Sequence, residues 1–319
     1  MAEADWSWRG QRIRYCQAGD PASGDVALLI HGFGACLGHW RHNLPVLAQQ
    51  AEVYALDLLG FGASAKPPSR LEGEVGAATS VRYGLDLWAE QIVAFLAEHG
   101  LCPSQQGSGG PPRRLHLIGN SIGAVVALNA ARLLMARGAP PAQVVLIDCA
   151  QRALDDKRIL ALPPWERLGR PLLKRAVRQR WLLAPLFRLL AQPAVVRAVL
   201  KQAYPSGANV DDALVEILLC PTRDPGALES FRGFVNLFND HLAPELLADL
   251  RLPVRMLWGA QDPWEDPAEA RRWAATYACI QELQVLEGLG HCPHDEAPER
   301  VNPILLRWLE QPIVQRTEA

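Results

Sequence analysis

The sequence has no hydrophobic run long enough for a membrane-spanning helix. Its most apolar stretch, residues 181–191, is interrupted by Pro185 and Arg188, whereas a spanning helix needs about 20 consecutive apolar residues. The first residues, MAEADWSWRGQRIRY, also lack the apolar core and the small-residue cleavage site of a secretory signal. These absences predict a soluble intracellular protein, most simply a cytoplasmic one.

Paired cysteines are missing as well. The chain has seven cysteines, none in a CxxC pair, at positions 16, 36, 102, 149, 220, 279 and 292. An odd and unclustered set predicts free thiols in a reducing compartment and argues against a disulfide framework.

The chain as a whole lacks an excess of either charge. Its 32 Lys and Arg residues stand against 34 Asp and Glu, which gives a formal net charge of −2. A nucleic-acid-binding protein is expected to carry a clear basic excess. We therefore expect no nucleic-acid partner.

What is present is ample material for a folded core. Of 319 residues, 49% are hydrophobic and 21% are charged, which excludes disordered and collagen-like chains. Short β-branched or apolar runs, typical of buried strands, occur at residues 26–30, 53–58, 115–118, 144–147, 254–258 and 283–286. Helical patterns lie between them, at residues 80–98, 122–136, 267–277 and 299–309. This alternation predicts an α/β fold with a mostly parallel, twisted sheet flanked by helices.

Two segments interrupt the alternation. Residues 103–114, PSQQGSGGPPRR, are rich in Gly, Pro and Ser and predict a surface loop. Residues 151–240 contain no convincing strand, so we expect a helical cap inserted into a core formed by residues 1–150 and 241–319. Such a cap would lie over the carboxyl ends of the strands, where open α/β sheets bind their ligands.

The most informative motif is Gly119-Asn120-Ser121-Ile122-Gly123, which follows the expected strand LHLI and precedes a helical run. In this strand–turn–helix setting a G-x-S-x-G pentapeptide is typical of a nucleophilic serine on a strained turn. A plain turn between strand and helix is the alternative. We predict Ser121 as the nucleophile.

A serine nucleophile needs a base that an acid orients. After this turn the chain order should be serine, then acid, then histidine. Asp262 follows the strand VRMLWG, and His291 follows the strand LQVLEG. Asp148, at the end of VVLID, is the competing acid. We favour Asp262 because the turn after its strand has the form Gly-x-x-Asp.

A backbone amide just after the first strong strand is expected to help hold the oxyanion of the reaction. The motif there is HGFG, which predicts the amides of Phe33 and Ile122 as the two donors. A tight loop without a catalytic donor is the alternative. The neighbouring residues are expected to line the substrate site: His31, Gly32, Gly34, Asn120 and Trp264. The Gly-rich turn at 57–64 lacks the Lys-Ser/Thr of a P-loop, so it does not predict nucleotide binding.

His294 and Asp295 lie close to His291, but no second cluster accompanies them, so we expect no metal site. We expect a structural hydrogen-bonding role for His294 and a packed thiol at Cys292. The serine chemistry requires no cofactor.

Together HGFG, DLLGFGAS, GNSIG, GAQDPW and GHCPHDE resemble the α/β-hydrolase superfamily over essentially the whole chain. Within it, the chain is similar to the pheophytinase and chlorophyll dephytylase group of chloroplasts and cyanobacteria. The features shared with that group are DLW at 86–88, LKQAY…NVDD at 200–212, DPW at 262–264 and GHCPHDE at 290–296. The resemblance implies cleavage of a phytyl ester by a serine triad, with a plastid stromal location as an alternative to the cytoplasm.

The charge balance hides a basic segment inside the expected cap. Residues 151–200 contain eleven Arg or Lys and three Asp or Glu, a local net charge of +8, and residues 167–210 contain no acid. Leu173, Val177 and Trp181 recur at helical spacing. One interpretation is a helix that packs this apolar face on the core and exposes its arginines. Another, compatible with the first, is peripheral docking on an anionic membrane.

The expected reaction is transfer of an acyl group from an ester to water. A lipophilic ester is favoured because the cap offers many Leu, Trp and Phe side chains but few acids. The alternatives are a general carboxylesterase, lipase or thioesterase, and a slow hydrolase-fold protein that binds a ligand.

Overall fold

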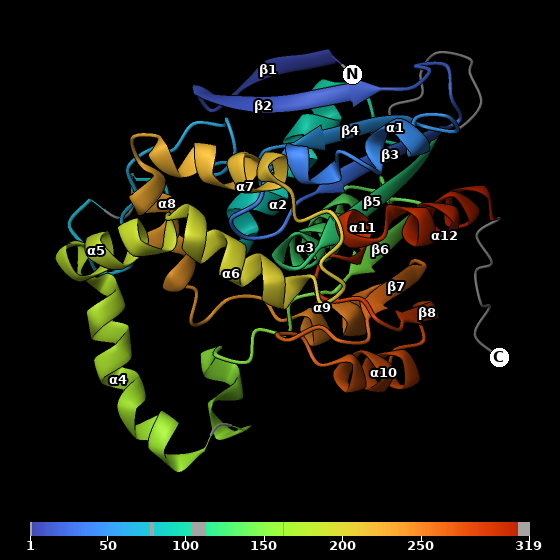
Figure 1. Ribbon diagram of the computed structural model, residues 1–319. Helices are drawn as coiled ribbons and strands as arrows, with labels where there is room; N and C mark the ends of the chain where they lie inside the picture. The colour runs from blue at the N-terminus through green and yellow to red at the C-terminus, as the bar shows by residue number, and fades with distance from the viewer. Residues whose placement is uncertain (1, 77–79, 104–112, 162, 312–319) are drawn as a thin grey trace.

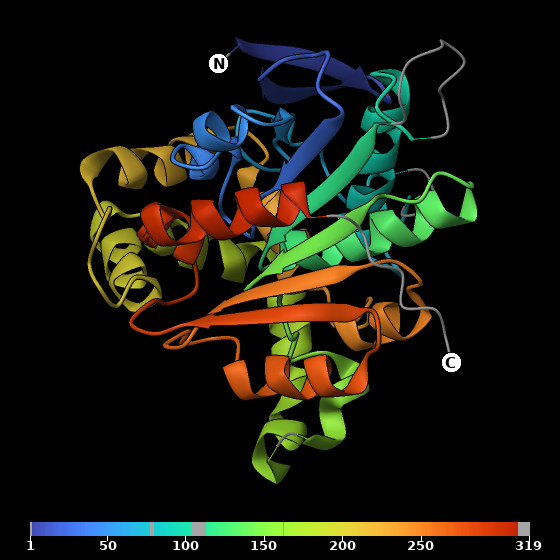
Figure 2. The same cartoon turned by 90° about the vertical axis from the view of Figure 1, so that its right-hand side faces the viewer.

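The computed structural model describes residues 2–76, 80–103, 113–161 and 163–311. Most of the loop expected at 103–114 therefore lies outside the described residues. Eight strands form one sheet in the order β1-β2-β4-β3-β5-β6-β7-β8 (Figures 1 and 2). The strands are β1 (Ala2–Trp8), β2 (Gln11–Ala18), β3 (Asp25–Ile30), β4 (Glu52–Leu56), β5 (Arg114–Asn120), β6 (Gln143–Ile147), β7 (Val254–Gly259) and β8 (Ile280–Leu286).

All six predicted strands are present, and β4-β3-β5-β6-β7-β8 pair in parallel. The predicted α/β-hydrolase architecture is thereby confirmed. The central strands are buried on both faces, because helices cover both sides of a parallel sheet. Along β3, Val26, Leu28 and Ile30 pack into one core layer, while Ala27 and Leu29 pack into the opposite one.

The helices of the core divide between these two layers. Residues of α1, α12 and the 3₁₀ turn η1 pack on one face, and residues of α2, α3, α9 and α10 pack on the other. Their bounds are η1 (Leu37–Trp40), α1 (Leu44–Leu47), α2 (Leu85–Glu98), α3 (Ile122–Ala136), α9 (Ala243–Asp249), α10 (Pro267–Thr276), α11 (Pro293–Glu296) and α12 (Pro298–Glu310). The four helices predicted for the core are thus confirmed as α2, α3, α10 and α12.

The antiparallel hairpin β1–β2 is absent from the predicted elements. Strand β1 pairs with β2, and β2 pairs antiparallel with β4 at the edge of the sheet. The two strands are joined at Arg9 and Gly10, which both have positive φ, as a tight hairpin turn requires. Trp6, Trp8 and Ile13 alternate with polar residues and are buried, so a period of two was the signal for these strands.

Between β6 and β7, the described regular structure is helical, which confirms the predicted insertion. It consists of η3 (Asp156–Ala161), α4 (Pro164–Arg178), α5 (Arg180–Leu190), α6 (Pro193–Ala203), α7 (Asp212–Leu219), η4 (Cys220–Arg223) and α8 (Ala227–Val235). We call residues 151–240 the cap; these domain limits stay a prediction. In both views, the segment with η3 and α4 projects beyond the rest of the molecule (Figures 1 and 2).

No single helix in the described part of the chain is long and apolar enough to cross a membrane. Helices α5 and α6 meet the length and composition criteria only as a pair, and their axes are bent by 74° at the break.

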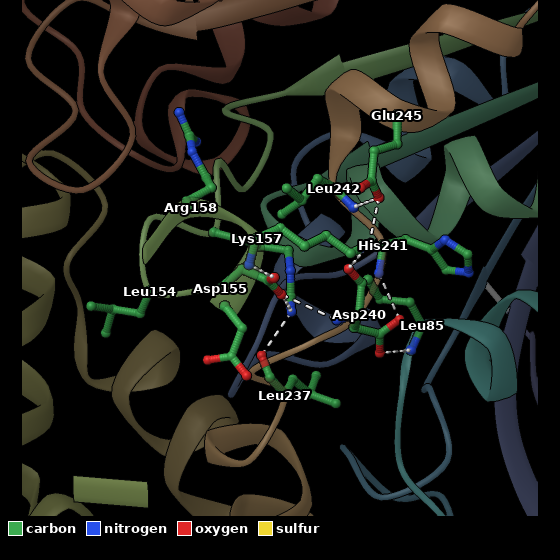
Figure 3. Close-up of polar contacts among 12 residues, drawn as sticks. Leu85, Leu154, Asp155, Lys157, Arg158, Leu237, Asp240, His241, Leu242 and Glu245 are labelled. Carbon is green, nitrogen blue, oxygen red and sulfur yellow. Dashed lines mark hydrogen bonds and ion pairs between the residues drawn. The ribbon is translucent and has the colours of Figure 1, made fainter. Parts of the chain in front are cut away.

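A polar network joins the two ends of the cap (Figure 3). The Asp155 carboxylate accepts hydrogen bonds from the Arg152 guanidinium at 2.7 Å, from the amide of Asp240 at 3.1 Å and from the amide of Lys157 at 3.0 Å. Arg152 also donates to the carbonyl of Leu237 at 2.7 Å. Because Asp155 is buried, its contacts carry more energy than exposed ones would.

Replacement of Asp155 with alanine is expected to lower the free energy of unfolding by about 3 kcal/mol, because the largely buried Arg152 loses its counter-ion. The matched control is Lys157→Ala, which removes an exposed ion pair with Glu245 and should cost less than about 1 kcal/mol. Urea unfolding measures both variants. Equal losses would show that the Asp155 network does not hold the cap.

Candidate active site

Ser121 occupies the tight turn between β5 and α3. Its backbone has φ 56° and ψ −123°, a left-handed conformation that costs a non-glycine residue about 1–3 kcal/mol and is concentrated at functional sites. The Ser121 amide donates to the carbonyl of Ile147 at 2.9 Å. The strained turn thus holds Ser121 at the carboxyl end of the sheet, as the pentapeptide predicts.

The glycines of the pentapeptide are required by close backbone contacts. A Cβ atom on Gly119 would lie 2.3 Å from the Gly123 carbonyl oxygen, and one on Gly123 would lie 2.4 Å from the carbonyl oxygens of Ile30 and His31. Any larger residue would push α3 away from the sheet. Strand β5, helix α3 and the HGFG loop therefore meet at Ser121.

His291 lies in the loop after β8, and its Nδ1 is 2.8 Å from Oδ2 of Asp262. The other oxygen of Asp262 accepts hydrogen bonds from the amides of Trp264 and Glu265, at 2.9 and 3.1 Å. With Nδ1 donating to the carboxylate, Nε2 is left as the acceptor nitrogen of a neutral ring. His291 is therefore oriented by Asp262.

Asn120 connects this histidine loop to the serine turn. Its side-chain amide nitrogen, Nδ2, donates to the backbone carbonyl oxygens of Ile147 and His291, both at 3.2 Å. Among the contacts of the described residues, no hydrogen bond joins the Ser121 hydroxyl to the His291 ring. In structures without substrate, such bonds are often long and tighten only when the substrate binds.

Asp148 and Asp262 are the two acids that the sequence offers as partners of His291, and their pKa values shift in opposite directions. Burial and the neighbouring charge of Asp262 raise the pKa of Asp148 well above its usual value. Burial also raises the pKa of Asp262, but the hydrogen bond and charge of His291 outweigh it and leave that pKa below its usual value. The acid that ionises first is thus the one bonded to the histidine.

Asp148, Asp262 and His291 offer side-chain atoms within 4.8 Å of one another, close enough to be considered as metal ligands. Metal ligands must be deprotonated. The raised pKa of Asp148 opposes this, and Nδ1 of His291 is engaged by Asp262. The cluster is two carboxylates beside a histidine, of which Asp262 contacts the ring and Asp148 accepts from the amide of Gly259.

The HGFG loop lies against the serine turn. A Cβ atom on Gly32 would be 3.1 Å from the Ser121 Cβ, so the backbone that precedes Phe33 is adjacent to Ser121. Ile122 is the first residue of α3, and an amide at this position has no partner within its helix. The geometry is compatible with the predicted oxyanion donors, whose role stays a prediction.

Asp57 supports this loop, a role that sequence reasoning missed. Its carboxylate accepts from the amides of Leu37 and Ala63, at 2.6 and 2.7 Å, and burial raises its pKa to about 6. Asp57 is the first residue of the glycine-rich turn at 57–64. The turn needs a glycine at position 62, because a Cβ atom there would lie 2.1 Å from the Asp57 carboxylate. The motif was visible in the sequence, but its function as a brace was not.

The residues predicted to line the substrate site occupy different environments. Trp264 is half-exposed and its ring meets the His291 ring edge-on, with centroids 4.8 Å apart. His31 is buried: Nδ1 contacts the carbonyl of Gly32 at 2.7 Å, and Nε2 accepts from the amide of Leu58 at 3.1 Å. These contacts fix the loop, so substrate contact by His31 stays a prediction.

An aromatic cluster from the cap covers the HGFG loop. The Phe33 ring stacks on Phe234 of α8, with centroids 3.6 Å apart, and lies 6.1 Å from Phe231. Phe187 of α5 approaches Phe231 at 5.2 Å. A mostly apolar pocket lies here, lined in part by Phe33, Phe61, Phe187 and Phe231. Sequence analysis missed these cap residues because they lie far from residue 33 along the chain.

A model of the alpha/beta hydrolase family matches residues 27–304 of this chain. The chain belongs to that family. Among curated proteins, the hydrolase is 25% identical to chloroplastic pheophytinase of Arabidopsis thaliana, with 97% of this chain and 66% of that protein covered. It is 26% identical to the dihydrolipoyllysine-residue acetyltransferase component of an acetoin cleaving system from Pseudomonas putida, with 95% and 68% covered.

Among solved structures, the hydrolase is similar to a membrane phospholipase A described as a bacterial virulence factor. The TM-score is 0.69 at 23% identity, with 97% of this chain and 86% of that chain covered. This likeness concerns the fold. Because the chain spans about two thirds of the length of its first curated relatives and those relatives differ in activity, their names do not assign its substrate.

The hydrolase departs from expectation at His294. Its ring is fully buried, and neither ring nitrogen has a hydrogen-bond partner among the described residues. The ring packs against those of Trp40 and His39, at 4.4 and 4.8 Å. The predicted hydrogen-bonding role is wrong for the side chain; only its backbone carbonyl accepts a bond, from Asn43. By contrast, Cys292 is buried in an apolar cluster, as predicted, and burial raises the pKa of its thiol; all seven cysteines are free.

Burial lowers the pKa of His294 well below its usual value. The folded state therefore keeps this ring neutral while the unfolded state binds a proton below about pH 6.5, so stability falls as pH falls through that value. We expect His294→Phe to reduce the slope of unfolding free energy against pH, between pH 7 and 5, by up to about 1.4 kcal/mol per unit. Urea unfolding at several pH values measures it; an unchanged slope would contradict the prediction.

Proposed function

We propose that the hydrolase cleaves a carboxylic ester with Ser121 as nucleophile, His291 as base and Asp262 as the acid that orients the base. The observation that carries this proposal is the 2.8 Å contact between His291 Nδ1 and Asp262, in a loop that Asn120 connects to the Ser121 turn. A serine hydroxyl is a weak nucleophile without such a pair.

In the proposed reaction, Nε2 of His291 takes the proton from the Ser121 hydroxyl as its oxygen attacks the ester carbonyl. The amides of Phe33 and Ile122 hold the negative charge that develops on the carbonyl oxygen. His291 then gives its proton to the leaving alcohol, which leaves an acyl group on Ser121. Water, activated by the same histidine, releases the acid and restores the serine.

We propose further that the ester is lipophilic, with the phytyl ester of chlorophyll-type pigments as the first candidate. Support comes from the apolar pocket between Phe33 and Phe187 of the cap and from the relation to pheophytinase along 97% of this chain. An aromatic and aliphatic lining favours a hydrocarbon group, because burial of apolar surface supplies most of the binding energy of such ligands.

The test is a hydrolysis screen with pheophytin a, a long-chain p-nitrophenyl ester and a short-chain one, each with wild-type protein and the Ser121→Ala variant. Release of phytol only by the wild type supports the full proposal. Activity on short esters with none on pheophytin would reject the pigment as substrate and favour a general carboxylesterase. Inactivity on every ester, with no labelling by a fluorophosphonate, would favour a ligand-binding protein instead.

A further inference from the structure

An exposed apolar surface covers the outer sides of two cap helices. On α4, the side chains of Trp165, Leu168 and Leu172 are 73%, 84% and 69% exposed. On α5, Trp181 is 71% exposed, and Leu182, Leu186 and Leu189 are exposed beside it. We call these seven residues the outer face. A water-exposed surface of this kind, on a helix pair of which α4 projects from the molecule (Figure 1), marks a site of interaction with a partner or a membrane.

The opposite side of α4 holds the helix to the body through basic residues. Arg170 and Lys174 reach the Asp156 carboxylate at 3.0 and 2.6 Å, and both cations lie 5.1 Å from the Phe238 ring. Arg178 donates to the carbonyl of Glu72 at 2.6 Å. The expectation that Leu173, Val177 and Trp181 pack on the core is therefore wrong for Leu173 and Trp181, which are exposed. Of the basic residues expected outside, Lys174 and Arg178 face inward, and Arg175 is exposed. A surface helix of a water-soluble protein has the reverse arrangement.

Two exposed cations accompany the outer face. Arg175 follows Leu172 by three residues, and Arg188 follows Trp181 by seven, so both lie on the same sides of their helices as these apolar residues. No acidic residue occurs between positions 167 and 210 to oppose them. Glu166, in the first turn of α4, is the one exposed acid on the two helices. Exposed tryptophan and leucine with flanking arginine and few acids is the composition of helices that lie in the interface of an anionic bilayer.

We infer that the outer face docks the hydrolase on the surface of a membrane that contains anionic lipid. Charge complementarity favours lipid over a second copy of this chain, because a two-fold interface through this face would place the same arginines against each other. Docking leaves both helices at the surface, since the inner side of α5 is occupied: Leu183 is buried, and Phe187 packs on Phe231 of the cap.

The position of α5 links this docking surface to the candidate active site. Its outer side carries Trp181 and Leu189, while Phe187 on its other side lines the apolar pocket together with Phe33. One helix thus separates the lipid from the pocket. A lipophilic ester leaving the bilayer would reach the pocket past α5 without crossing bulk water. This delivery step rests on the proposed function, whereas docking itself does not.

Sedimentation of the full chain with vesicles tests the inference. We expect binding to vesicles of phosphatidylcholine and phosphatidylglycerol (about 7:3), much weaker binding to phosphatidylcholine alone, and loss of binding as salt rises. The double variant Arg175→Gln/Arg188→Gln should weaken binding at least about tenfold, and Trp165→Ser/Leu168→Ser/Leu172→Ser should abolish it. The matched control Arg251→Gln/Arg271→Gln removes two exposed arginines of the core and should bind like the wild type.

Binding that ignores anionic lipid and salt, or that survives both outer-face variants, would overturn the inference. A dimer that forms without vesicles, and that Trp165→Ser/Leu168→Ser/Leu172→Ser dissociates, would also overturn the inference. The outer face would then bind a second copy of the chain. Hydrolysis of a short dispersed ester, measured on the same samples, keeps the two proposals distinct. It should be equal in the wild type and the outer-face variants; its absence from all of them would reject the proposed function and leave the docking result standing.

Discussion

Replacement of Ser121 with alanine is expected to lower kcat/KM for ester hydrolysis by about 10⁵-fold. The variant loses the only proposed nucleophile, while the turn that carries it is held by backbone contacts: the amide of residue 121 to Ile147, and the close packing of Gly119 and Gly123. The fold should therefore persist. Initial rates on a short-chain ester measure the loss, and circular dichroism checks the fold.

The matched control is Ser230→Ala. Ser230 lines the apolar pocket, but its hydroxyl donates to the carbonyl of Ala227 at 2.9 Å, so its loss should cost less than about tenfold in activity. A fluorophosphonate should add mass to the wild type and to Ser230→Ala, and none to Ser121→Ala. Residual activity of Ser121→Ala above a tenth of wild type would show that another group attacks the ester.

The second large effect is expected at Asp262. In Asp262→Asn, an amide replaces the carboxylate that faces Nδ1 of His291, which favours the wrong tautomer of the ring and leaves a developing imidazolium without its counter-charge. We expect kcat to fall by about 10⁴-fold. The measurement is kcat under saturating short-chain ester at pH 8, with unfolding curves to confirm that the variant remains folded.

Asp148→Asn is the corresponding test of the alternative acid. Asp148 is fully buried, and its Oδ1 accepts from the amide of Gly259 at 2.9 Å, a bond that an asparagine oxygen can keep. Burial and the charge of Asp262 raise the pKa of Asp148 and so favour its neutral form. Replacement of this carboxyl by a neutral amide should therefore change kcat less than about tenfold. A larger loss in Asp148→Asn than in Asp262→Asn would reverse the assignment of the two acids.

The sequence predicted those features whose signal is local. Six parallel strands were recognisable from apolar runs such as 26–30 and 144–147. The central strands are apolar because helices cover both of their faces, whereas β8 at the edge of the sheet is only partly buried. The positions of Ser121, Asp262 and His291 after three such strands were also readable, because the ends of parallel strands converge at one edge of the sheet. The hairpin β1–β2 has no such apolar run, because its strands alternate apolar and polar residues, as Trp6 and Trp8 do with Asp5 and Ser7.

The sequence favoured Asp262 over Asp148 but left both acids as candidates. Both acids follow parallel strands, and both lie near His291 in the folded chain. Which carboxylate meets Nδ1 at 2.8 Å depends on the turn after β7, where the amides of Trp264 and Glu265 fix the Asp262 side chain. The pKa values then follow from burial and from this pairing.

The orientation of α4 was decided by tertiary contacts alone. The periodic pattern showed an apolar side and a basic side, and the ordinary hydrophobic effect would bury the first. In the structure, Asp156 and the carbonyl of Glu72 hold the basic side inward, and Trp165 and Leu168 are left exposed. A helix pattern defines two faces, but which face is covered depends on where distant segments place their charges.

By itself, the sequence determined the fold class, the order of the candidate catalytic residues along the chain and the basic character of the cap, because each depends on patterns of neighbouring residues. Only the tertiary structure decided that Asp262 pairs with His291, that Asp57 braces the segment after Phe33 at the amide of Leu37, and that α4 turns its apolar side outward. These are contacts between segments distant along the chain, and their energies depend on burial and distance rather than on local pattern.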